Sequence, residues 1–529
     1  MGNYFDRWML LDNDMLVKCT QAFFSALPLF EVPGFCFKIV FPHEPELTKA
    51  SGIERRRIDL YRLSWSKEEL KSIVGVGRII YDSYEVLTYE CDAQTFFKRA
   101  PDVVVFPLST EEVVKIVDVC RRYGVPFLAR GSGTALCGSA VAAVGGVMIV
   151  FSRMRRVLEV DLENQRVVVE PCVTANELSA LLSKYGFFYA PDPASYMVSS
   201  IGGNIAHNAG GNHCIKYGVT TNHVLGLEVV LPTGEVLELG GKALDPPGYD
   251  LVGLMVGSEG TLGIVTKATL RILRRPPGSA AILAVFDSIL DASNTVSEVI
   301  AKGLTPAAIE FMDQLAIIAV ESGVKACGLP KDAAAILLFE VEGNEDELDA
   351  QGEVIMEICR KNHSRSVVMA KDSAGIARLM AGRKAAFGSM GNLAPAFVVD
   401  DGTIPRSKLP EMMQMIKEKS RECGLMIANV FHAGEGNLHP LILYNPKNKD
   451  EAEKALKVGL EILKLCLEIG GTITGEHGVG LEKKELMPVQ YSEEELRVMA
   501  TIKMIFDPAG LCNPGKVLPE RFVTRSEHA

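Results

Sequence analysis

Three glycine-rich segments constrain the fold of this chain more than any other feature. They are residues 130–138, 200–211 and 257–263. Glycine lets the backbone adopt positive φ and approach a ligand closely. Successive N–H groups in such turns form a concave nest for an anion such as a pyrophosphate. Any one segment could be an ordinary turn, but three segments, all beside Ser, Thr or Asn, favour a dinucleotide site.

Two common nucleotide-binding folds do not fit this pattern. No Gly-x-Gly-x-x-Gly motif opens a helix after a strand, so the fingerprint of the Rossmann fold is missing. The pair Gly240-Gly241 is followed by Lys242 and Ala243, so the chain has no P-loop. The glycines therefore predict a nucleotide site of another kind.

Helices and strands alternate along the rest of the chain. A buried strand over 102–106 precedes a helix that begins with a capping box, Ser109 and Glu112, and ends at Gly124. A strand over 125–129 feeds the first glycine segment. Further on, long amphipathic helices alternate with apolar strands, which indicates a second α+β domain. These helices are expected at 290–303, 345–362, 410–424 and 450–470, and the strands at 281–286, 335–341 and 425–431.

We therefore divide the chain into an N-terminal extension, two domains and a helical C-terminal segment. Their expected bounds are 1–70, 71–276, 277–480 and 481–529. The extension carries Arg55, Arg56, Arg57 and several aromatic residues, among them Trp8 and Trp65. Two interpretations stay open for it: a helical element that packs on the body, or a docking surface for a partner subunit.

Charge and composition exclude several classes of protein. The 529 residues include 55 Lys and Arg against 66 Asp and Glu, a net charge of -11, which argues against nucleic acid as the main partner. No stretch reaches the roughly 20 apolar residues of a transmembrane helix. Asp6, Asp12 and Asp14 interrupt any signal peptide, so a cytoplasmic location is expected. The 12 cysteines include no Cys-x-x-Cys pair, which argues against an iron–sulfur cluster.

Two histidines flank a Gly-Glu-Gly-Asn turn between apolar strands, a pattern typical of a hairpin. His432 and His439 lie symmetrically about the turn, and Glu435 is expected to be a turn residue. In a regular hairpin the two side chains would face each other directly, with Cβ atoms about 5 Å apart. The two imidazoles could share one divalent ion, although from spacing alone hydrogen-bonded structural histidines are the more frequent case.

Two further segments offer the remaining groups of a catalytic site. Glu476 and His477 stand side by side between glycines, so that one could bind an ion and the other point at a substrate. Two imidazoles and one carboxylate suit a catalytic divalent metal with open positions. Arg383 could bind a carboxylate bidentately or could be a solvated surface residue, and the sequence leaves both interpretations open.

The segment from Pro191-Asp192-Pro193 through Ser200-Ile201-Gly202-Gly203-Asn204 to Gly211 resembles the FAD-binding signature of the vanillyl-alcohol oxidase/p-cresol methylhydroxylase (PCMH) superfamily. The loop Arg130–Thr134 is similar to its pyrophosphate loop. The resemblance implies an α+β fold: a PCMH-type FAD domain of two subdomains, and an α+β cap domain that carries the substrate site. Some members attach FAD through a histidine where this chain has Thr134, so non-covalent FAD is expected.

The resemblance also implies which residues contact FAD. They are Arg130, Gly131, Ser132, Gly133, Thr134, Gly138, Pro191, Asp192, Ser199, Gly202, Gly203, Asn204, Asn208, Gly210, Gly257, Glu259, Gly263, Ile264 and, returning from the C-terminus, Asn513 or Lys516.

The segments around His432 and Glu476 resemble the FAD-linked glycolate oxidase and D-lactate dehydrogenase group, whose members often carry Asp where this chain has Glu435. The resemblance implies a divalent metal (Zn, Fe or Mn) on His432, His439 and Glu476, with His477 as base and Arg383 on the substrate carboxylate. It predicts oxidation of a small D-2-hydroxy acid, glycolate or D-lactate, to the 2-oxo acid.

Electrons would leave to an external acceptor, either an electron-transfer flavoprotein or an iron–sulfur subunit, and such a partner could hold the chain at a membrane surface. Apolar and acidic residues at 397–401 favour a monocarboxylate substrate. Two alternatives remain: a non-catalytic flavin-binding scaffold subunit of an oxidase complex, and a flavoprotein with non-redox chemistry such as ether-lipid synthesis.

Overall fold

The computed structural model describes residues 60–243, 247–324 and 326–523. The chain divides into two compact units, Met1–Arg55 and Arg56–Ala529, and every described residue belongs to the second. Residues 1–59 of the N-terminal extension expected at 1–70 therefore lie outside the described residues, and so do the two interpretations that were left open for them. Among the described helices, none combines the length and the apolar character needed to span a bilayer.

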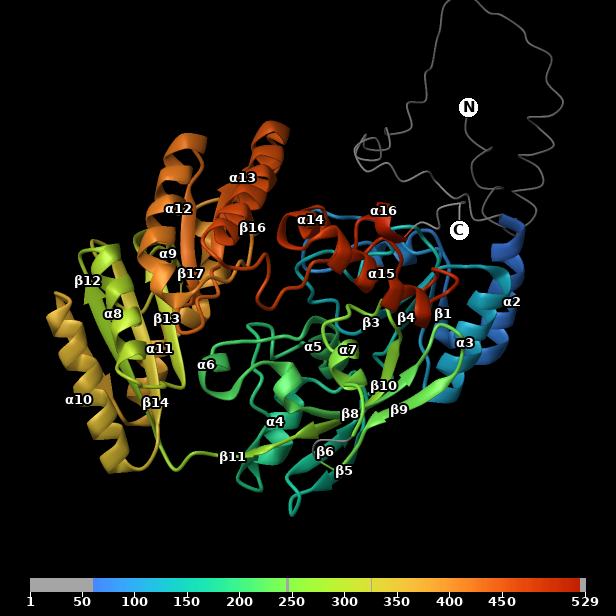
Figure 1. Cartoon of the computed structure of the whole chain (residues 1–529), viewed down its shortest axis with the longest axis horizontal. Coiled ribbons are helices and arrows are strands. Elements are labelled where there is room, and N and C mark those ends of the chain that lie inside the picture. Colours follow the sequence, from blue (N-terminus) through green and yellow to red (C-terminus); the bar gives the residue numbers. More distant parts are fainter. Residues whose placement is uncertain (1–59, 244–246, 325, 524–529) are drawn as a thin grey trace, which may run out of the picture. The chain divides into compact units, whose positions relative to one another are not determined.

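Two larger sheets and a two-stranded ladder of β7 and β11 form the part of the chain that carries the glycine-rich segments, here called the glycine-loop half (residues 79–274; Figure 1). The first has the order β1-β2-β4-β3 and the second the order β5-β6-β10-β8-β9. Strands β2, β4 and β3 run parallel, whereas the second sheet is antiparallel. The strands are β1 (Ile79–Ile80), β2 (Val103–Val105), β3 (Phe127–Arg130), β4 (Val147–Val150), β5 (Val157–Asp161), β6 (Arg166–Val169), β7 (Phe187–Phe188), β8 (Val224–Val230), β9 (Val236–Gly240), β10 (Ile264–Arg271) and β11 (Leu273–Arg274).

Six α-helices of the described residues accompany these sheets, and α3 shows the signals that begin and end a helix. The helices are α2 (Leu60–Val74), α3 (Thr110–Tyr123), α4 (Ala175–Ser183), α5 (Ile201–His207), α6 (Cys214–Tyr217) and α7 (Leu251–Met255). Ser109 caps α3 by accepting a hydrogen bond from Glu112 N, and Gly124 ends α3 with φ 64°. The predicted reciprocal box is incomplete, because the Glu112 carboxylate binds Arg78 instead.

A third, seven-stranded sheet with the order β15-β12-β14-β13-β17-β18-β16 forms the rest of the body, here called the histidine half (residues 279–480). Its strands are β12 (Ser279–Phe286), β13 (Ala308–Asp313), β14 (Ala335–Glu342), β15 (Ser366–Ala370), β16 (Ala396–Val399), β17 (Ile427–His432) and β18 (Pro440–Tyr444). Its helices are α8 (Ile289–Ala301), α9 (Gln314–Glu321), α10 (Glu345–Lys361), α11 (Ser373–Ser389), α12 (Leu409–Cys423) and α13 (Lys449–Glu468).

Strand alternation divides the helices of the histidine half between the two faces of its sheet. Ile282 and Phe286 face the core that α8, α10, α12 and α13 cover, whereas Val285 faces the core under α9 and α11. The even-numbered residues of β13 and β17, such as Met312 and Val430, point to the face that α9 and α11 cover. This arrangement, with the two sheets described above, confirms the predicted α+β class.

The C-terminal segment returns to the glycine-loop half. Its helices are α14 (Met487–Gln490), α15 (Glu493–Phe506) and α16 (Glu520–Val523). Phe127 of β3 forms a parallel bridge with Cys512, and Asn513 N donates to Phe127 O at 2.7 Å. The segment thereby extends the first sheet beside the loop that follows β3.

Candidate active site

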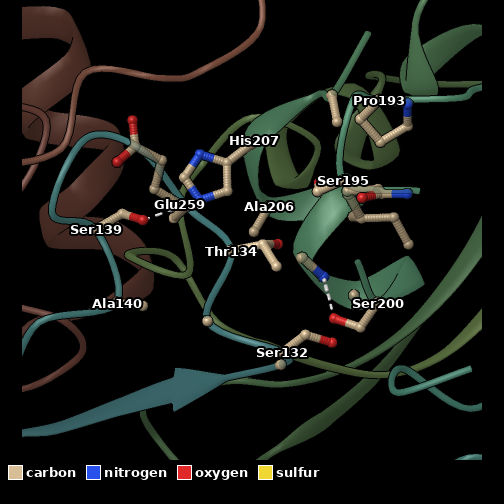
Figure 2. Close-up of a pocket in the computed structure, with 18 of the residues that line it drawn as sticks. Ser132, Thr134, Ser139, Ala140, Pro193, Ser195, Ser200, Ala206, His207 and Glu259 are labelled. Atoms are coloured by element: carbon tan, nitrogen blue, oxygen red, sulfur yellow. Dashed lines mark hydrogen bonds between the residues drawn. The ribbon is translucent and has the colours of Figure 1, made fainter. Parts of the chain in front are cut away.

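A cavity of about 390 Å³ lies where the glycine-rich loops meet the histidine half. Residues from both halves line it, and Figure 2 shows Thr134 in the cavity with Ser132 and Ser200 at one end and His207 and Glu259 at the other. The histidine half contributes Arg383, Phe387, His432, His439, Glu476 and His477. The cavity thus joins the two sets of residues that the sequence singles out.

The first two glycine segments pack so closely that a side chain would not fit between them. A Cβ on Gly131 would lie 2.0 Å from Ser200 Oγ, and Gly133 has φ +72°. Ser200 Oγ caps α5 by accepting from Gly203 N at 3.2 Å. The lining is therefore largely backbone, as a cradle for a flat or anionic ligand requires.

The residues predicted to contact FAD fall into two groups. Those that line the cavity are Arg130, Gly131, Ser132, Gly133, Thr134, Gly202, Gly203, Asn204, Glu259, Gly263 and Ile264. Those that do not line it are Gly138, Pro191, Asp192, Ser199, Asn208, Gly210, Gly257, Asn513 and Lys516.

The second group contains residues that hold loops in place. The Asp192 carboxylate pairs with His213 Nδ1 at 2.7 Å. Asn513 Nδ2 donates to the backbone oxygens of Ser139 and Glu259, at 3.1 and 2.8 Å, and Lys516 Nζ donates to Asn513 Oδ1 at 3.1 Å. Asn513 thereby supports Ser139 and Glu259, two residues that line the cavity.

The histidine hairpin differs from the prediction in its register. Strand β17 pairs with β18 as Asn429↔Pro440, and an isolated bridge joins His432 to Asn437. The prediction that His432 faces His439 directly is therefore wrong by two residues. Because side chains alternate between faces, a shift of two leaves both histidines on the same face. Their ring centroids lie 5.1 Å apart, with the planes at 85°.

Glu476 meets both histidines. Its Oε1 lies 3.5 Å from His432 Nε2 and 3.2 Å from His439 Nε2, and one ligand atom from each residue lies within 4.8 Å of the others. Both ring nitrogens of His439 and Glu476 Oε2 are buried without a hydrogen-bond partner. Together with His432 Nε2, these unpartnered atoms form a set of two imidazoles and one carboxylate that fits a divalent ion.

Glu310 connects the histidine pair to Arg383. It stands opposite His432 in the β13–β17 register. Its carboxylate accepts hydrogen bonds from His432 Nδ1 at 2.7 Å and from Arg383 Nε at 2.5 Å. Burial raises the pKa of Glu310, but Arg383 and His432 outweigh it and lower that pKa overall. Since Glu310 accepts the hydrogen bond of His432 Nδ1–H, His432 Nε2 is left to face Glu476.

Arg383 is not a surface residue, because its side chain is only 5% exposed. The open alternative of a solvated arginine is therefore wrong. Its Nη2 atom is buried with no hydrogen-bond partner, and the residue lines the cavity. A guanidinium with one edge bound to Glu310 and a free nitrogen beside the cavity is suited to an anionic ligand.

His477 lies against this cluster. Its ring stacks on that of His439, with centroids 5.1 Å apart and planes at 2°. Its Nε2 lies 3.9 Å from Glu476 Oε1, and its Nδ1 lies 3.8 Å from Asp401 Oδ1. Burial lowers the pKa of His477 to about 4, against the opposing effect of Asp401. The imidazole is therefore neutral at pH 7 and able to accept a proton.

The loop that carries Glu476 and His477 is wound around Asp401. Asp401 Oδ2 accepts from the backbone N–H groups of Gly475, Glu476 and His477 at 2.7–2.9 Å, and Lys483 binds Oδ1. These bonds fix the direction of both side chains.

Sequence reasoning missed several residues of the site, among them Glu310, Asp401, Lys483 and His207. A signal existed for Glu310, a carboxylate between the apolar residues Ile309 and Phe311 of strand β13, because a buried charge requires partners. Glu435, expected to be a turn residue, has a buried Oε1 with no hydrogen-bond partner, and burial raises its pKa to about 8.

Two family models match consecutive parts of the chain. The FAD binding domain family matches residues 101–240, and the C-terminal domain of FAD linked oxidases matches residues 275–517. The chain is 42% identical over 441 residues to the glycolate oxidase subunit GlcD of Escherichia coli K12, a match that covers 83% of this chain and 88% of the relative. It is 33% identical to the mitochondrial cytochrome D-lactate dehydrogenase of Arabidopsis thaliana, with 82% and 77% covered.

Solved structures share the fold at low sequence identity. The 4-ethylphenol oxidase of Gulosibacter chungangensis superposes with a TM-score of 0.74 at 19% identity, covering 88% of this chain and 99% of that one. p-Cresol methylhydroxylase superposes with a TM-score of 0.73 at 17% identity, covering 87% and 98%. The two family models and these relatives show that the chain belongs to the FAD-linked oxidases, in the group that contains GlcD and the D-lactate dehydrogenases, and its fold is that of the PCMH type.

Proposed function

We propose that this protein oxidises a small D-2-hydroxy acid, D-lactate or glycolate, to the 2-oxo acid with FAD as the hydride acceptor. The observation that carries the proposal is the convergence of Arg383 Nη2, neutral His477 and the His432–His439–Glu476 cluster on the cavity that the glycine loops line. The names of the relatives, a glycolate oxidase subunit and a D-lactate dehydrogenase, support the same reaction.

The residues of the cavity fit both FAD and a divalent ion. The glycine-lined cavity suits FAD, with the backbone of residues 131–134 and 202–204 against the cofactor and Thr134 offering no covalent link. The unpartnered atoms of His439 and Glu476 suit a divalent ion of the Zn, Fe or Mn type. When bound, FAD supplies hydride acceptance, and the ion lowers the pKa of the coordinated hydroxyl.

The chain itself binds, orients and deprotonates the substrate. Arg383 Nη2 donates to the substrate carboxylate, while Glu310 holds the other edge of the guanidinium in place. His477 accepts the proton of the 2-hydroxyl as the hydride of carbon 2 leaves for the flavin. The products are the 2-oxo acid, reduced cofactor and protonated His477.

The walls of the cavity favour a short substrate. Phe387 lies one turn after Arg383 on α11, with its ring centroid 5.7 Å from the guanidinium carbon and 6.1 Å from the centroid of the His439 ring. An aromatic wall next to the carboxylate-binding group offers no partner for a second charge. This arrangement supports a monocarboxylate.

Anaerobic bleaching of the flavin spectrum tests the proposal. We expect D-lactate or glycolate to reduce the bound FAD, and L-lactate and D-2-hydroxyglutarate to reduce it at least about tenfold more slowly. If no 2-hydroxy acid bleached the flavin, the scaffold alternative would replace the enzyme proposal. The reduced protein then allows a test of the expected partner, since either an electron-transfer flavoprotein or an iron–sulfur protein should reoxidise it.

The Arg383→Lys variant tests the carboxylate contact. A lysine keeps the charge, but a single ammonium cannot bind Glu310 and the substrate in the geometry of a guanidinium. We expect KM for D-lactate to rise about 10- to 100-fold, with a smaller change in the limiting rate of flavin reduction. Lys384→Gln, an exposed change on the same helix, is the matched control. An unchanged KM in Arg383→Lys would remove Arg383 from the substrate site.

A further inference from the structure

The loop that carries His477 is held from both halves of the protein. Asp401 of the histidine half holds it on one side, and Lys483 binds the second oxygen of that carboxylate. On its other side, residues 477–482 contact the glycine-loop half through His207, Glu259 and the backbone of Cys137. The second set of contacts has no part in the reaction proposed so far.

Glu259 turns its carboxylate towards this loop. Its Oε1 accepts from Val479 N at 2.7 Å, and its Oε2 accepts from Gly480 N at 2.9 Å. The residue is only 4% exposed and has φ +52°, an uncommon value for a residue with a side chain. Cys137 O adds a bond from Leu481 N at 2.9 Å. Glu259 therefore lines the cavity, while its carboxylate oxygens accept hydrogen bonds from the loop.

His207 contacts the backbone of His477 itself. Its Nδ1 lies 2.8 Å from His477 O. A carbonyl oxygen can only accept, so Nδ1 carries the hydrogen, and in the neutral ring Nε2 accepts from the Ser139 hydroxyl at 2.9 Å. His207 is the last residue of α5, whose first turn contains the cavity-lining Gly202 and Gly203. Figure 2 shows the His207 ring beside Ser139 and Glu259.

The contact leaves no space for a side chain on the loop. A Cβ on Gly478 would lie 2.8 Å from both Glu259 Oε1 and His207 Nδ1, and Gly478 has φ +89°. The loop, Glu259 and His207 thus fit together at one point. Glu259, His207 and Cys137 also form a second group of metal-ligand types within 4.8 Å, but hydrogen bonds already occupy both ring nitrogens of His207 and both oxygens of Glu259.

We propose that His207 and Glu259 are positioning residues through which the glycine-loop half holds His477 at the flavin. The inference rests on the proposed function, since it assigns His477 as the base. Cofactor and substrate are bound by different halves, so a small displacement of this loop would separate the base from the hydride path. Misplacement by about 1 Å can cost a factor of about 100 in rate.

Three variants at two positions test the proposal. His207→Leu removes the bond to His477 O, whereas His207→Asn can place an amide N–H where Nδ1 stands. We expect the limiting rate of anaerobic flavin reduction to fall about 10- to 100-fold in His207→Leu and to recover to within about threefold in His207→Asn. FAD content and the KM for D-lactate should stay unchanged in both. Glu259→Gln, which replaces one acceptor oxygen by an NH₂ group facing the loop N–H groups, should lower the rate in the same way.

A matched control separates positioning from general destabilisation. His223 is also buried in the glycine-loop half, and its Nε2 lies 3.0 Å from the carbonyl of Tyr217, away from the loop. His223→Leu therefore removes the same kind of bond and should leave the limiting reduction rate unchanged. If His207→Leu kept the wild-type rate, or lost FAD in proportion to activity, the positioning role would be wrong.

A double-mutant cycle shows whether His207 acts through His477. In a His477→Ala background, His207→Leu should lower the remaining reduction rate by less than about threefold. An equal loss in both backgrounds would overturn the inference and leave the proposed function standing. A wild-type rate in His477→Ala alone would instead overturn the base assignment, and a loss in His207→Leu would then have to arise elsewhere.

Discussion

The His477→Ala variant is expected to retain its FAD and to lose flavin reduction by D-lactate about 100- to 10,000-fold. General base catalysis contributes a factor of this size. The imidazole is buried and neutral, it lies against the His439 ring, and it lines the cavity. Alanine leaves no group there to take the hydroxyl proton. Stopped-flow reduction under anaerobic conditions measures the loss directly.

The control for this variant is the exposed histidine His363, whose side chain is 81% exposed. His363→Ala should reduce at the wild-type rate. The KM of His477→Ala should change little, because the proposed contact with the substrate carboxylate is made by Arg383. An unchanged limiting rate in His477→Ala, with full FAD occupancy, would reject the base assignment while leaving the family and the cofactor intact.

Local patterns in the sequence were sufficient for much of the fold. The helices expected at 345–362 and 410–424 agree closely with α10 (Glu345–Lys361) and α12 (Leu409–Cys423), because each shows helical periodicity and a clear terminus. The glycine segments around Gly131 and Gly202 were found for a similar reason. Where the backbone passes within contact distance of another segment, only glycine fits, and a cluster of glycines in the sequence therefore indicates such a place.

The register of the histidine hairpin could not be read in the same way. Symmetry about the turn places His432 opposite His439, but the strands pair with a shift of two residues. Both arrangements put the two rings on one face, so the hydrophobic pattern does not distinguish them. Which histidines share a face followed from the sequence; which residue stands opposite each of them depended on the tertiary packing of the sheet.

The residues that support the site were harder still to predict. Glu310 and Asp401 come from strand and loop positions 91 residues apart in the numbering, and each is defined by partners distant in sequence. Asp401 binds the backbone of residues 475–477, and Glu310 binds His432 and Arg383. In a sequence, a buried carboxylate can be recognised only as an acidic residue among apolar ones. Its role can be assigned only when the fold shows which groups it hydrogen-bonds.

Removal of a divalent ion is the second change with a large expected effect. The His432–His439–Glu476 cluster leaves both His439 nitrogens and Glu476 Oε2 without hydrogen-bond partners in a buried site, an arrangement that is costly unless a cation occupies it. Glu310 further prepares His432 by binding its Nδ1, which directs Nε2 towards Glu476. We expect one divalent ion per chain by elemental analysis.

Dialysis against a chelator should remove this ion and lower flavin reduction about 100-fold or more, and added Zn²⁺, Mn²⁺ or Fe²⁺ should restore it. His439→Ala should purify with FAD but without the ion, and no addition should rescue it. The His207→Asn variant is the matched control, because it alters the second group of ligand types, whose donor atoms are already hydrogen-bonded, and should keep the full metal content. A metal-free protein that still reduced its flavin at the original rate would show that the cluster is an ordinary network of buried histidines. Substrate binding and deprotonation would then depend on Arg383 and His477 alone.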